Sequence, residues 1–290
     1  MLMLVDAATL YYRAYYALPD SMVDATGAPV NAIRGFFDGL RTLRDAYSPD
    51  RIVACWDEDW RPQWRVDLLP SYKTHRVAGE GEETPDSLSP QIPVIAAVCA
   101  ALGIPVVGAP GMEADDVVAA LAFSAAEPVA VVSGDRDLTQ LVSDRDQRRL
   151  LYLGTGVGKH TVYDDALVRS TYGVEPSQYA DLSTLRGDPS DGIPGAAGIG
   201  AKTAAAYLNA FGDLEGILSA AASVTPPITR TKAETLLRDA EMLRATRRVV
   251  TLHPAALEIP AVAVHPEDAV ALAERYALSS TLRRWGVPGL

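Results

Sequence analysis

The sequence contains few cysteines, few histidines and no long apolar run, and each scarcity excludes a class of protein. Its two cysteines, Cys55 and Cys99, lie inside apolar segments, which is typical of buried thiols in a reducing compartment rather than of a disulfide or a zinc site. The four histidines show no metal-ligand spacing and are expected to be exposed or locally bonded. No apolar run reaches the length of about 18 residues that spans a membrane, and the N-terminus lacks the features of a secretory signal. We therefore expect a cytoplasmic protein with no membrane partner.

Basic residues are also in the minority. The 37 acidic residues outnumber the 26 basic ones and give a formal net charge of −11, which argues against a broadly basic surface for polyanions. If the partner is a nucleic acid, the contacts must therefore be local. An acidic excess can also arise from carboxylates gathered around metal ions, so the positions of the acids become informative. The 290 residues and 48% hydrophobic content suffice for one large α/β unit or two smaller ones.

Three short apolar runs end in carboxylates. The runs MLMLVDA, RIVACWDED and VAVVSGDRD reach Asp6, Asp57, and the pair Asp135 and Asp137, respectively. Between them, residues 31–47 and 91–103 have the apolar spacing of amphipathic helices. Strands that alternate with helices indicate an α/β fold whose central sheet is mostly parallel and flanked by helices. Because ligands bind beyond the carboxyl ends of parallel strands, we expect the acids of the three runs to converge there.

The two carboxylates at the end of the third run are separated by Arg136. Side chains alternate along an extended backbone, so we expect Arg136 to point away from its acidic neighbours. Asp135 and Asp137 would then lie close together and share one site.

A fourth acidic group opens a predicted helix at residues 111–127. Glu113, Asp115 and Asp116 fall in its first turn, and helical spacing puts Glu113 and Asp116 on one face. The helix dipole favours acids at helix starts, so a simple cap is the alternative interpretation. The three acidic strand ends nearby in the chain favour a shared site instead.

Two segments outside these runs have compositions of their own. Residues 58–90 are basic and aromatic in their first half and acidic in their second, without long periodicity, so a substrate-gripping segment and a disordered surface loop are both compatible. From about Tyr172 the pattern is helical, which divides the chain into residues 1–171 and 172–290. In residues 185–212, glycine and proline turns lead directly into a helix. Backbone N–H groups at such a start can bind a phosphate, and Lys202 would strengthen the contact.

Nine carboxylates are the candidate metal ligands. They are Asp6, Asp57, Glu113, Asp115, Asp116, Asp135, Asp137, Asp188 and Asp191. At one site they could not all stay ionised without a cation, because like charges at short range raise each other's pKa. Oxygen ligands without Cys or His favour Mg²⁺ or Mn²⁺, and two such ions about 4 Å apart would activate a water and stabilise the leaving oxygen in phosphodiester cleavage. The alternative, nine separate caps and surface charges, does not explain why independent segments all end in acids.

Six sequence blocks add a resemblance. In chain order they are VDAATLYYRAYYAL, CWDED, PSYKTHR, GMEADDVVAAL, SGDRDLTQLV and LRGDPSDGIPGAAGIGAKTA. This order resembles the bacterial and bacteriophage 5′ nucleases, which include the 5′ nuclease domain of DNA polymerase I and, more distantly, the flap endonucleases. The resemblance extends from residue 1 to about 212. It implies a PIN-like 5′ nuclease fold, followed by a helical region with a helix-three-turn-helix DNA-binding module at about residues 185–212. No polymerase or proofreading block follows, so we expect a free-standing member.

The resemblance assigns the carboxylates to two metal positions. The first would be lined by Asp6, Asp57, Glu113, Asp115, Asp116 and Asp135. The second would be completed by Asp137, Asp188 and Asp191. A K⁺ ion is also implied at the turn of the helix-three-turn-helix module.

The resemblance also assigns roles to cations and glycines. The implied catalytic residues are Tyr72, Lys73 and Arg76, at the base of a helical arch over residues 58–90, where Lys73 and Arg76 would contact the scissile phosphate. The implied DNA contacts are Arg13, Arg65, Gly198, Gly200, Lys202 and Thr203. The chain departs from the family at Ala7, Val66 and Gly192, where Gly, His and Asn are common. None of these departures removes a carboxylate, so we expect an active enzyme.

We therefore predict a structure-specific, metal-dependent 5′ nuclease of DNA replication and repair, including Okazaki fragment processing. It would cut 5′ flaps near their junction with duplex DNA and trim 5′ ends, leaving 5′-phosphates, with RNA-primed ends as a further candidate substrate. We expect it to act as a monomer. One alternative is a PIN-type ribonuclease, although such domains usually lack a glycine-rich module like residues 185–212. The other is a non-catalytic helix-hairpin DNA-binding module, which leaves the nine acids unexplained.

Overall fold

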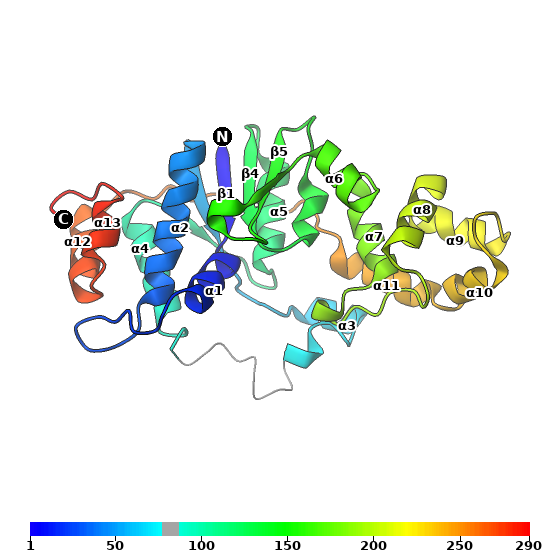
Figure 1. Ribbon diagram of the computed structural model, residues 1–290, viewed down its shortest axis with the longest axis horizontal. Coiled ribbons are helices and arrows are strands. Elements are labelled where there is room, and N and C mark those ends of the chain that lie inside the picture. Colours follow the sequence, from blue (N-terminus) through cyan, green and yellow to red (C-terminus); the bar gives the residue numbers. More distant parts are fainter. Residues whose placement is uncertain (77–86) are drawn as a thin grey trace.

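The computed structural model describes residues 1–76 and 87–290. Its centre is a six-stranded sheet in the order β3-β2-β1-β4-β5-β6, in which neighbouring strands are parallel except β5 and β6. The strands are β1 (Leu2–Asp6), β2 (Arg51–Cys55), β3 (Val106–Val107), β4 (Val129–Ser133), β5 (Arg148–Tyr152) and β6 (Thr161–Tyr163). The predicted α/β fold with a mostly parallel sheet is confirmed (Figure 1). The three apolar runs that end in carboxylates form the adjacent strands β2, β1 and β4.

Both faces of the sheet are buried, which is why its strands are nearly continuous apolar runs. Met3 and Val5 of β1 face a core that includes Phe36, whereas Leu2 and Leu4 face the opposite core. The first core is covered by α1 (Ala7–Ala17), α2 (Asn31–Tyr47) and α4 (Gln91–Ala101), and the second by α5 (Ala114–Ser124). The helices predicted at residues 31–47 and 91–103 are thus present.

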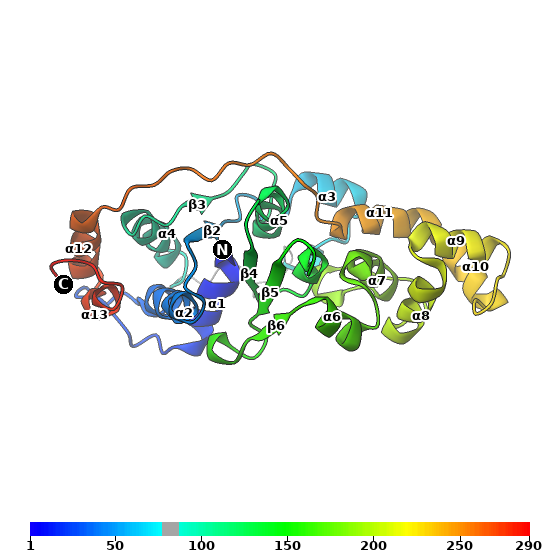
Figure 2. The same ribbon diagram turned by 90° about the horizontal axis from the view of Figure 1, so that it is seen from above.

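The second part of the chain is helical, as its pattern predicts, but it packs in two places. One body with its own core contains α7 (Tyr179–Arg186), α8 (Ala201–Phe211), α9 (Leu214–Ala222), α10 (Arg230–Arg238) and α11 (Ala240–Val250), and α6 (Asp165–Tyr172) lies beside it. Residues 251–265 then run back past α5 and β3 (Figure 2). The last helices, α12 (Pro266–Arg275) and α13 (Ser279–Arg283), pack beside α2 and α4 through Ala269, Leu278 and Leu282. The carboxyl-terminal helices therefore share the core of the first part.

Short helices connect these elements. They are α3 (Gln63–Leu68) and the 3₁₀ turns η1 (Thr74–Arg76), η2 (Asp137–Leu141), η3 (Val157–Lys159), η4 (Pro176–Gln178) and η5 (Pro189–Asp191). Both α3 and η1 belong to the predicted arch at residues 58–90, of which residues 77–86 lie outside the described residues. Cys55 and Cys99 are buried and free, as predicted. Among the described residues, no helix has both the length and the apolar character that crossing a membrane requires.

Candidate active site

The acidic strand ends meet at one edge of the sheet. Asp6 is the last residue of β1, and Asp57 and Asp135 lie just beyond the ends of β2 and β4. Because β1 pairs in parallel with both of these strands, the three carboxyl ends lie side by side. The start of α5 joins them, since the N–H of Ala114 donates to Asp57 Oδ1 at 2.8 Å. The fold thus brings together four segments that are far apart in the sequence.

Asp6 is held in place by hydroxyl residues that are not among the sequence candidates. Its carboxylate is 5% exposed and accepts hydrogen bonds from the Thr9 N–H at 3.0 Å and the Ser133 hydroxyl at 2.6 Å. The Thr9 hydroxyl donates to it as well. Ser133 Oγ also accepts from the N–H of Asp135 at 2.9 Å, so one hydroxyl fixes two of the acids. The sequence signal for both is a small hydroxyl residue next to an acidic strand end.

Asp115, Asp135 and Asp137 have no cationic partner within the described residues, unlike the acids that bind Arg65, Lys73 and Arg76. Burial raises the pKa of Asp115 well above its usual value, and the charge of Asp135 raises it further. Burial also raises the pKa of Asp135, and that of Asp137 well above its usual value. The charge of Lys73 lowers the pKa of Asp115 and Asp135, and that of Arg186 lowers the pKa of Asp137, but neither offsets the effect of burial. A bound cation would therefore favour the ionised forms.

Arg65 lies behind the acids rather than in front of them. It is 2% exposed, and its two terminal nitrogens donate to the two Asp116 oxygens, each at 2.7 Å. Its Nε donates to the carbonyl of Val249 at 3.0 Å, and its charge lies 3.3 Å from Glu113. A buried guanidinium whose donors are taken cannot also bind a backbone phosphate. The implied DNA contact by Arg65 is therefore corrected: Arg65 positions Glu113 and Asp116.

Tyr72 and Lys73 both bind Glu113. The Tyr72 hydroxyl donates to the two Glu113 oxygens at 2.9 and 3.1 Å, and Lys73 Nζ donates to Glu113 Oε1 at 2.9 Å. Burial nevertheless raises the pKa of Glu113, because Lys73 and Arg65 offset only part of the cost. The Lys73 side chain is 12% exposed, in contrast to the buried Arg65. Its ammonium group stands at the border between the acids and solvent.

Arg76 joins the arch segment to the turn that carries the last two acids. It donates to Asp191 Oδ1 at 2.8 Å and to the Ser190 carbonyl at 3.0 Å. The N–H of Lys73, which has a left-handed backbone with φ of 48°, donates to the Asp191 carbonyl at 2.9 Å. Asp188 caps the same turn by accepting from the Ser190 N–H at 2.9 Å. The Lys73–Arg76 segment and η5 therefore form one unit.

Gly192 is required by this close approach. Its φ is 69°, and a Cβ at this position would overlap the carbonyl oxygen of Ser71 and stand 3.0 Å from the carbonyl carbon. The close approach of Ser71 therefore explains why this chain has glycine at residue 192, where the family that it resembles often has Asn.

We expect Gly192→Ala to lower the free energy of unfolding by about 3 kcal/mol, from left-handed backbone strain plus the overlap. Gly27→Ala is the matched control, because Gly27 has a φ of 88° and an added Cβ would meet nothing within 4 Å. It should cost only about 1 kcal/mol. Urea denaturation of both variants measures the difference, and equal losses would contradict the close contact.

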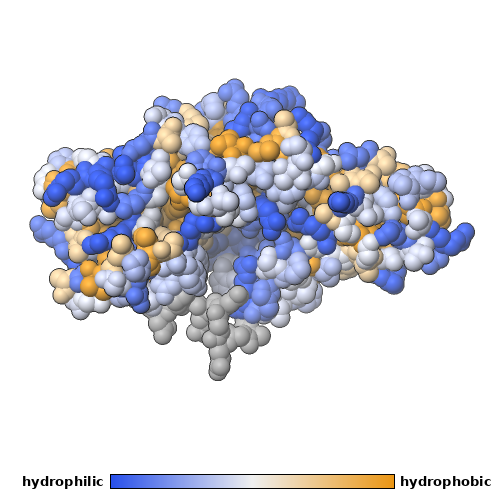
Figure 3. Space-filling model, in the orientation of Figure 1, coloured by the Kyte–Doolittle hydropathy of each residue, from blue (hydrophilic) through white to orange (hydrophobic). Residues whose placement is uncertain are grey.

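A cavity of about 230 Å³ opens beside the acids. Its walls are Thr9, Gly134, Asp135, Arg136, Tyr152, Asp188, Ser190 and Asp191. Acids from the β4 end and from η5 thus face the same space. Figure 3 shows that this side of the molecule is hollowed and largely hydrophilic between α1 and the helical body. A charged ligand could therefore reach the carboxylates directly.

The backbone at Arg136 is not extended, so the alternation from which we predicted that it points away from Asp135 and Asp137 does not apply. Arg136 lines the cavity together with Asp135, and Asp188 is among the groups that raise its pKa against the lowering effect of burial. The alternation rule fails because the backbone at Arg136 is helical, with φ of −78° and ψ of −20°, and η2 begins at the next residue. Arg136 thus brings a positive charge to the cavity wall.

The donor set fits a hard divalent cation by its chemistry. The ligands are carboxylate oxygens, and four of them, Asp57, Asp115, Asp135 and Asp137, have raised pKa values and form no ion pair in the described part of the chain. Their positions do not define a closed site, since no group of three Asp, Glu, His or Cys side chains within residues 1–76 and 87–290 is arranged to hold one ion. Three of the candidate acids, Asp135, Asp188 and Asp191, line the cavity instead.

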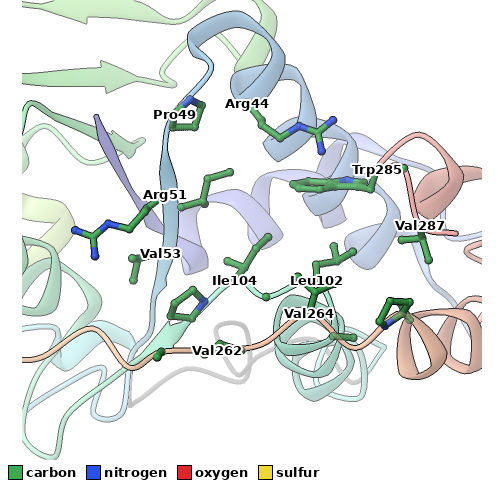
Figure 4. Close-up of a pocket in the computed structure, with 18 of the residues that line it drawn as sticks. Arg44, Pro49, Arg51, Val53, Leu102, Ile104, Val262, Val264, Trp285 and Val287 are labelled. Carbon is green, nitrogen blue, oxygen red and sulfur yellow. The ribbon is translucent and has the colours of Figure 1, made fainter.

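A larger cavity lies elsewhere and lacks this chemistry. It measures about 680 Å³ and lies near the amino-terminal ends of β2 and β3, between residues 259–266 and the carboxyl-terminal helices (Figure 4). Ile52, Leu102, Val262 and Trp285 form much of its wall, and Asp50 is the one acid among its lining residues in the described part of the chain. Size alone therefore does not locate the candidate active site.

The remaining implied DNA contacts lie in two places. Arg13, on α1, stands beside the cavity, with a terminal nitrogen 3.7 Å from where a Cβ on Gly134 would lie. Gly198 and Gly200 are exposed at the turn before α8, and its first turn contains the exposed Lys202 and the half-buried Thr203.

Comparisons with known proteins agree with this architecture. Two family models match: "5'-3' exonuclease, N-terminal resolvase-like domain" over residues 1–173 and "5'-3' exonuclease, C-terminal SAM fold" over residues 174–269. The chain is 48% identical to a 5′-3′ exonuclease of Streptomyces coelicolor, covering 97% of this chain and 98% of that protein. It is 42% identical to a 5′-3′ exonuclease of Mycobacterium tuberculosis, covering 98% and 96%.

A solved structure shares the fold. The T5 D15 protein, co-crystallized with metal ions, superposes with a TM-score of 0.71 at 20% identity, covering 99% of this chain and 98% of that one. The predicted resemblance to 5′ nucleases is confirmed by the family models and the full-length relatives. Because the family models match most of its length and full-length relatives exceed 40% identity, this chain belongs to the 5′-3′ exonuclease family.

Proposed function

We propose that the 5′-3′ exonuclease activity of this family resides, in this chain, in the carboxylates at the ends of β1, β2 and β4 and the start of α5. The observation that carries the proposal is the group formed by Asp115, Asp135 and Asp137. These acids have raised pKa values and form no ion pair in the described residues, and Asp135 lines an open cavity. Such a group is costly for folding, which points to function.

Divalent cations, Mg²⁺ or Mn²⁺, would be held by these acids. Asp6, Asp57, Asp115 and Asp135 would hold one, with Glu113 and Asp116 positioned behind them by Arg65. Asp137, Asp188 and Asp191 would hold a second. When bound, such ions lower the pKa of a water molecule and neutralise charge on the scissile phosphate. The metal ions co-crystallized with the T5 D15 protein support this use of the fold.

The chain's own cations would position the substrate. Lys73 and Arg76 are anchored to Glu113 and Asp191, so their charges stay at the border of the site. A phosphate placed there would meet these cations and Arg136 across the cavity. The turn before α8 would hold the duplex through backbone N–H groups, which need no net positive charge. This local arrangement is compatible with a net charge of −11.

The substrate we propose is DNA with a 5′ flap or a single-strand to duplex junction, cut to leave 5′-phosphates. RNA-primed 5′ ends would be a further substrate. We propose that the protein acts as a monomer in the cytoplasm, in replication and repair.

The test compares a labelled 5′-flap duplex, the corresponding blunt duplex and a single-stranded RNA of equal length, with Mg²⁺ and with EDTA. We expect cleavage near the flap junction with Mg²⁺ and none with EDTA. Preferential cleavage of the RNA would favour a PIN-type ribonuclease instead. Tight binding of the flap duplex, with no cleavage in the presence of any divalent ion, would favour a non-catalytic DNA-binding module.

A further inference from the structure

Most helices in the second half of this protein begin with an acid, but two helices that begin with cations instead come together at Gly198. From α5 to α12, six helices carry an acid in the first turn, as the helix dipole favours. Only α8 and α10 in this described stretch carry none, and they begin with Lys202 and with Arg230 and Lys232 instead. Each therefore adds cationic side chains to the positive end of its own dipole.

Lys232 connects the two helix starts. Its ammonium group donates a hydrogen bond to the carbonyl oxygen of Gly198, in the turn that precedes α8. Gly198 has a φ of 73°, and a Cβ built on it would stand 3.8 Å from Lys232 Nζ. The Lys232 side chain is half-buried, so its ammonium group lies at the Gly198 turn and does not extend freely into solvent.

This arrangement does not fit the K⁺ ion that the family resemblance implies at the turn. A K⁺ ion is held by oxygen atoms, and the Gly198 carbonyl already accepts from an ammonium group. A further cation there would be repelled by Lys232 and by two helix starts without acids. The groups at this carbonyl therefore do not fit the implied K⁺ ion.

We infer that Lys232 supplies the positive charge at the Gly198 turn, so that duplex binding by this chain does not depend on K⁺. The inference rests on the proposed function, since it concerns how the same DNA is held. Lys232 acts as a positioning residue: it fixes the Gly198 carbonyl and thereby the exposed backbone N–H groups that lead into α8.

The experiment measures binding of a fluorescent 5′-flap duplex by anisotropy in EDTA, so that no cleavage occurs. KCl, NaCl and tetramethylammonium chloride are compared at equal ionic strength, because tetramethylammonium is too large to replace K⁺ between carbonyl groups. The wild-type Kd should agree among the three salts within about twofold. In tetramethylammonium, Lys232→Met should bind about tenfold more weakly, which corresponds to one charged hydrogen bond, and KCl should restore part of the loss.

Arg238→Met is the matched control. Arg238 lies at the other end of α10, is exposed and pairs with Asp239, so its loss removes one charge without touching the turn. It should change binding only slightly and equally in all three salts. Should Lys232→Met fail to fold, two measurements still test the inference. They are duplex binding by Lys232→Arg and the comparison of wild-type binding among the three salts.

Wild-type binding several-fold tighter in KCl than in tetramethylammonium, with the same ratio in Lys232→Met, would overturn the inference. Absence of duplex binding in every salt would instead overturn the proposed function, and the inference with it.

Discussion

Asp115→Asn is expected to lower the rate of 5′-flap cleavage about a thousandfold while leaving the protein folded. Asp115 is half-buried beside Asp135 and Asp6, and its charge is strongly opposed by its surroundings. A carboxylate retained at such a cost is best explained by a bound divalent ion, whose contribution to the transition state is worth several kcal/mol. An amide of the same shape removes the charge without creating a cavity. In EDTA the variant should therefore be at least as stable as the wild type.

Asp181→Asn provides the control for Asp115→Asn. Asp181 is more deeply buried than Asp115, at 2% exposure, and burial raises its pKa as well, but it lies on α7 and pairs with Arg247. Its substitution should reduce the melting temperature and leave the single-turnover rate per folded molecule nearly unchanged. Asp135→Asn should behave like Asp115→Asn. Undiminished cleavage by both Asp115→Asn and Asp135→Asn would remove the basis of the assignment.

Lys73→Met should lower the cleavage rate about a hundredfold, with a smaller effect on duplex binding. The ammonium group lies 2.9 Å from Glu113 at the border of the site, where it can meet the negative charge that develops on the phosphate. Its removal also leaves Glu113 with less compensation, so the pKa of Glu113 should rise further. The single-turnover rate at saturating enzyme separates this effect from binding.

Lys159→Met is the control for Lys73→Met, because Lys159 is exposed on η3 and is not among the residues that line the cavity. Lys73→Arg should recover part of the rate, since it keeps the charge. An equal fall in rate for Lys73→Met and Lys159→Met would mean that only net charge matters and would contradict the role of Lys73.

The acidic strand ends are predictable from the sequence because one local rule governs them. A buried parallel strand is an apolar run, and an acid just beyond it must lie at the carboxyl edge of the sheet. This rule places Asp6, Asp57 and Asp135 at that edge from their position in the chain alone. The same rule gives no indication of Thr9 and Ser133, whose hydroxyl groups bind Asp6 across two segments.

The errors concern long-range packing and local backbone state. Arg65 has the sequence context of a surface cation, but its partner Asp116 is distant in the sequence and burial follows from that pairing. Alternation does not apply at Arg136, because the strand has already ended there. The helical pattern of residues 266–290 predicts helices but not that they pack with α2, since amphipathic faces do not specify their partner.

The most direct measurement of the central claim is the anomalous diffraction of a crystal soaked in Mn²⁺. We expect manganese peaks at the cavity edge, bound by Asp115 and Asp135 and bordered by Asp6, with a further peak toward Asp137 and Asp191. Soaked crystals of Asp115→Asn should lose the first peak. Manganese bound only to exposed acids away from the ends of β1, β2 and β4 would contradict the account.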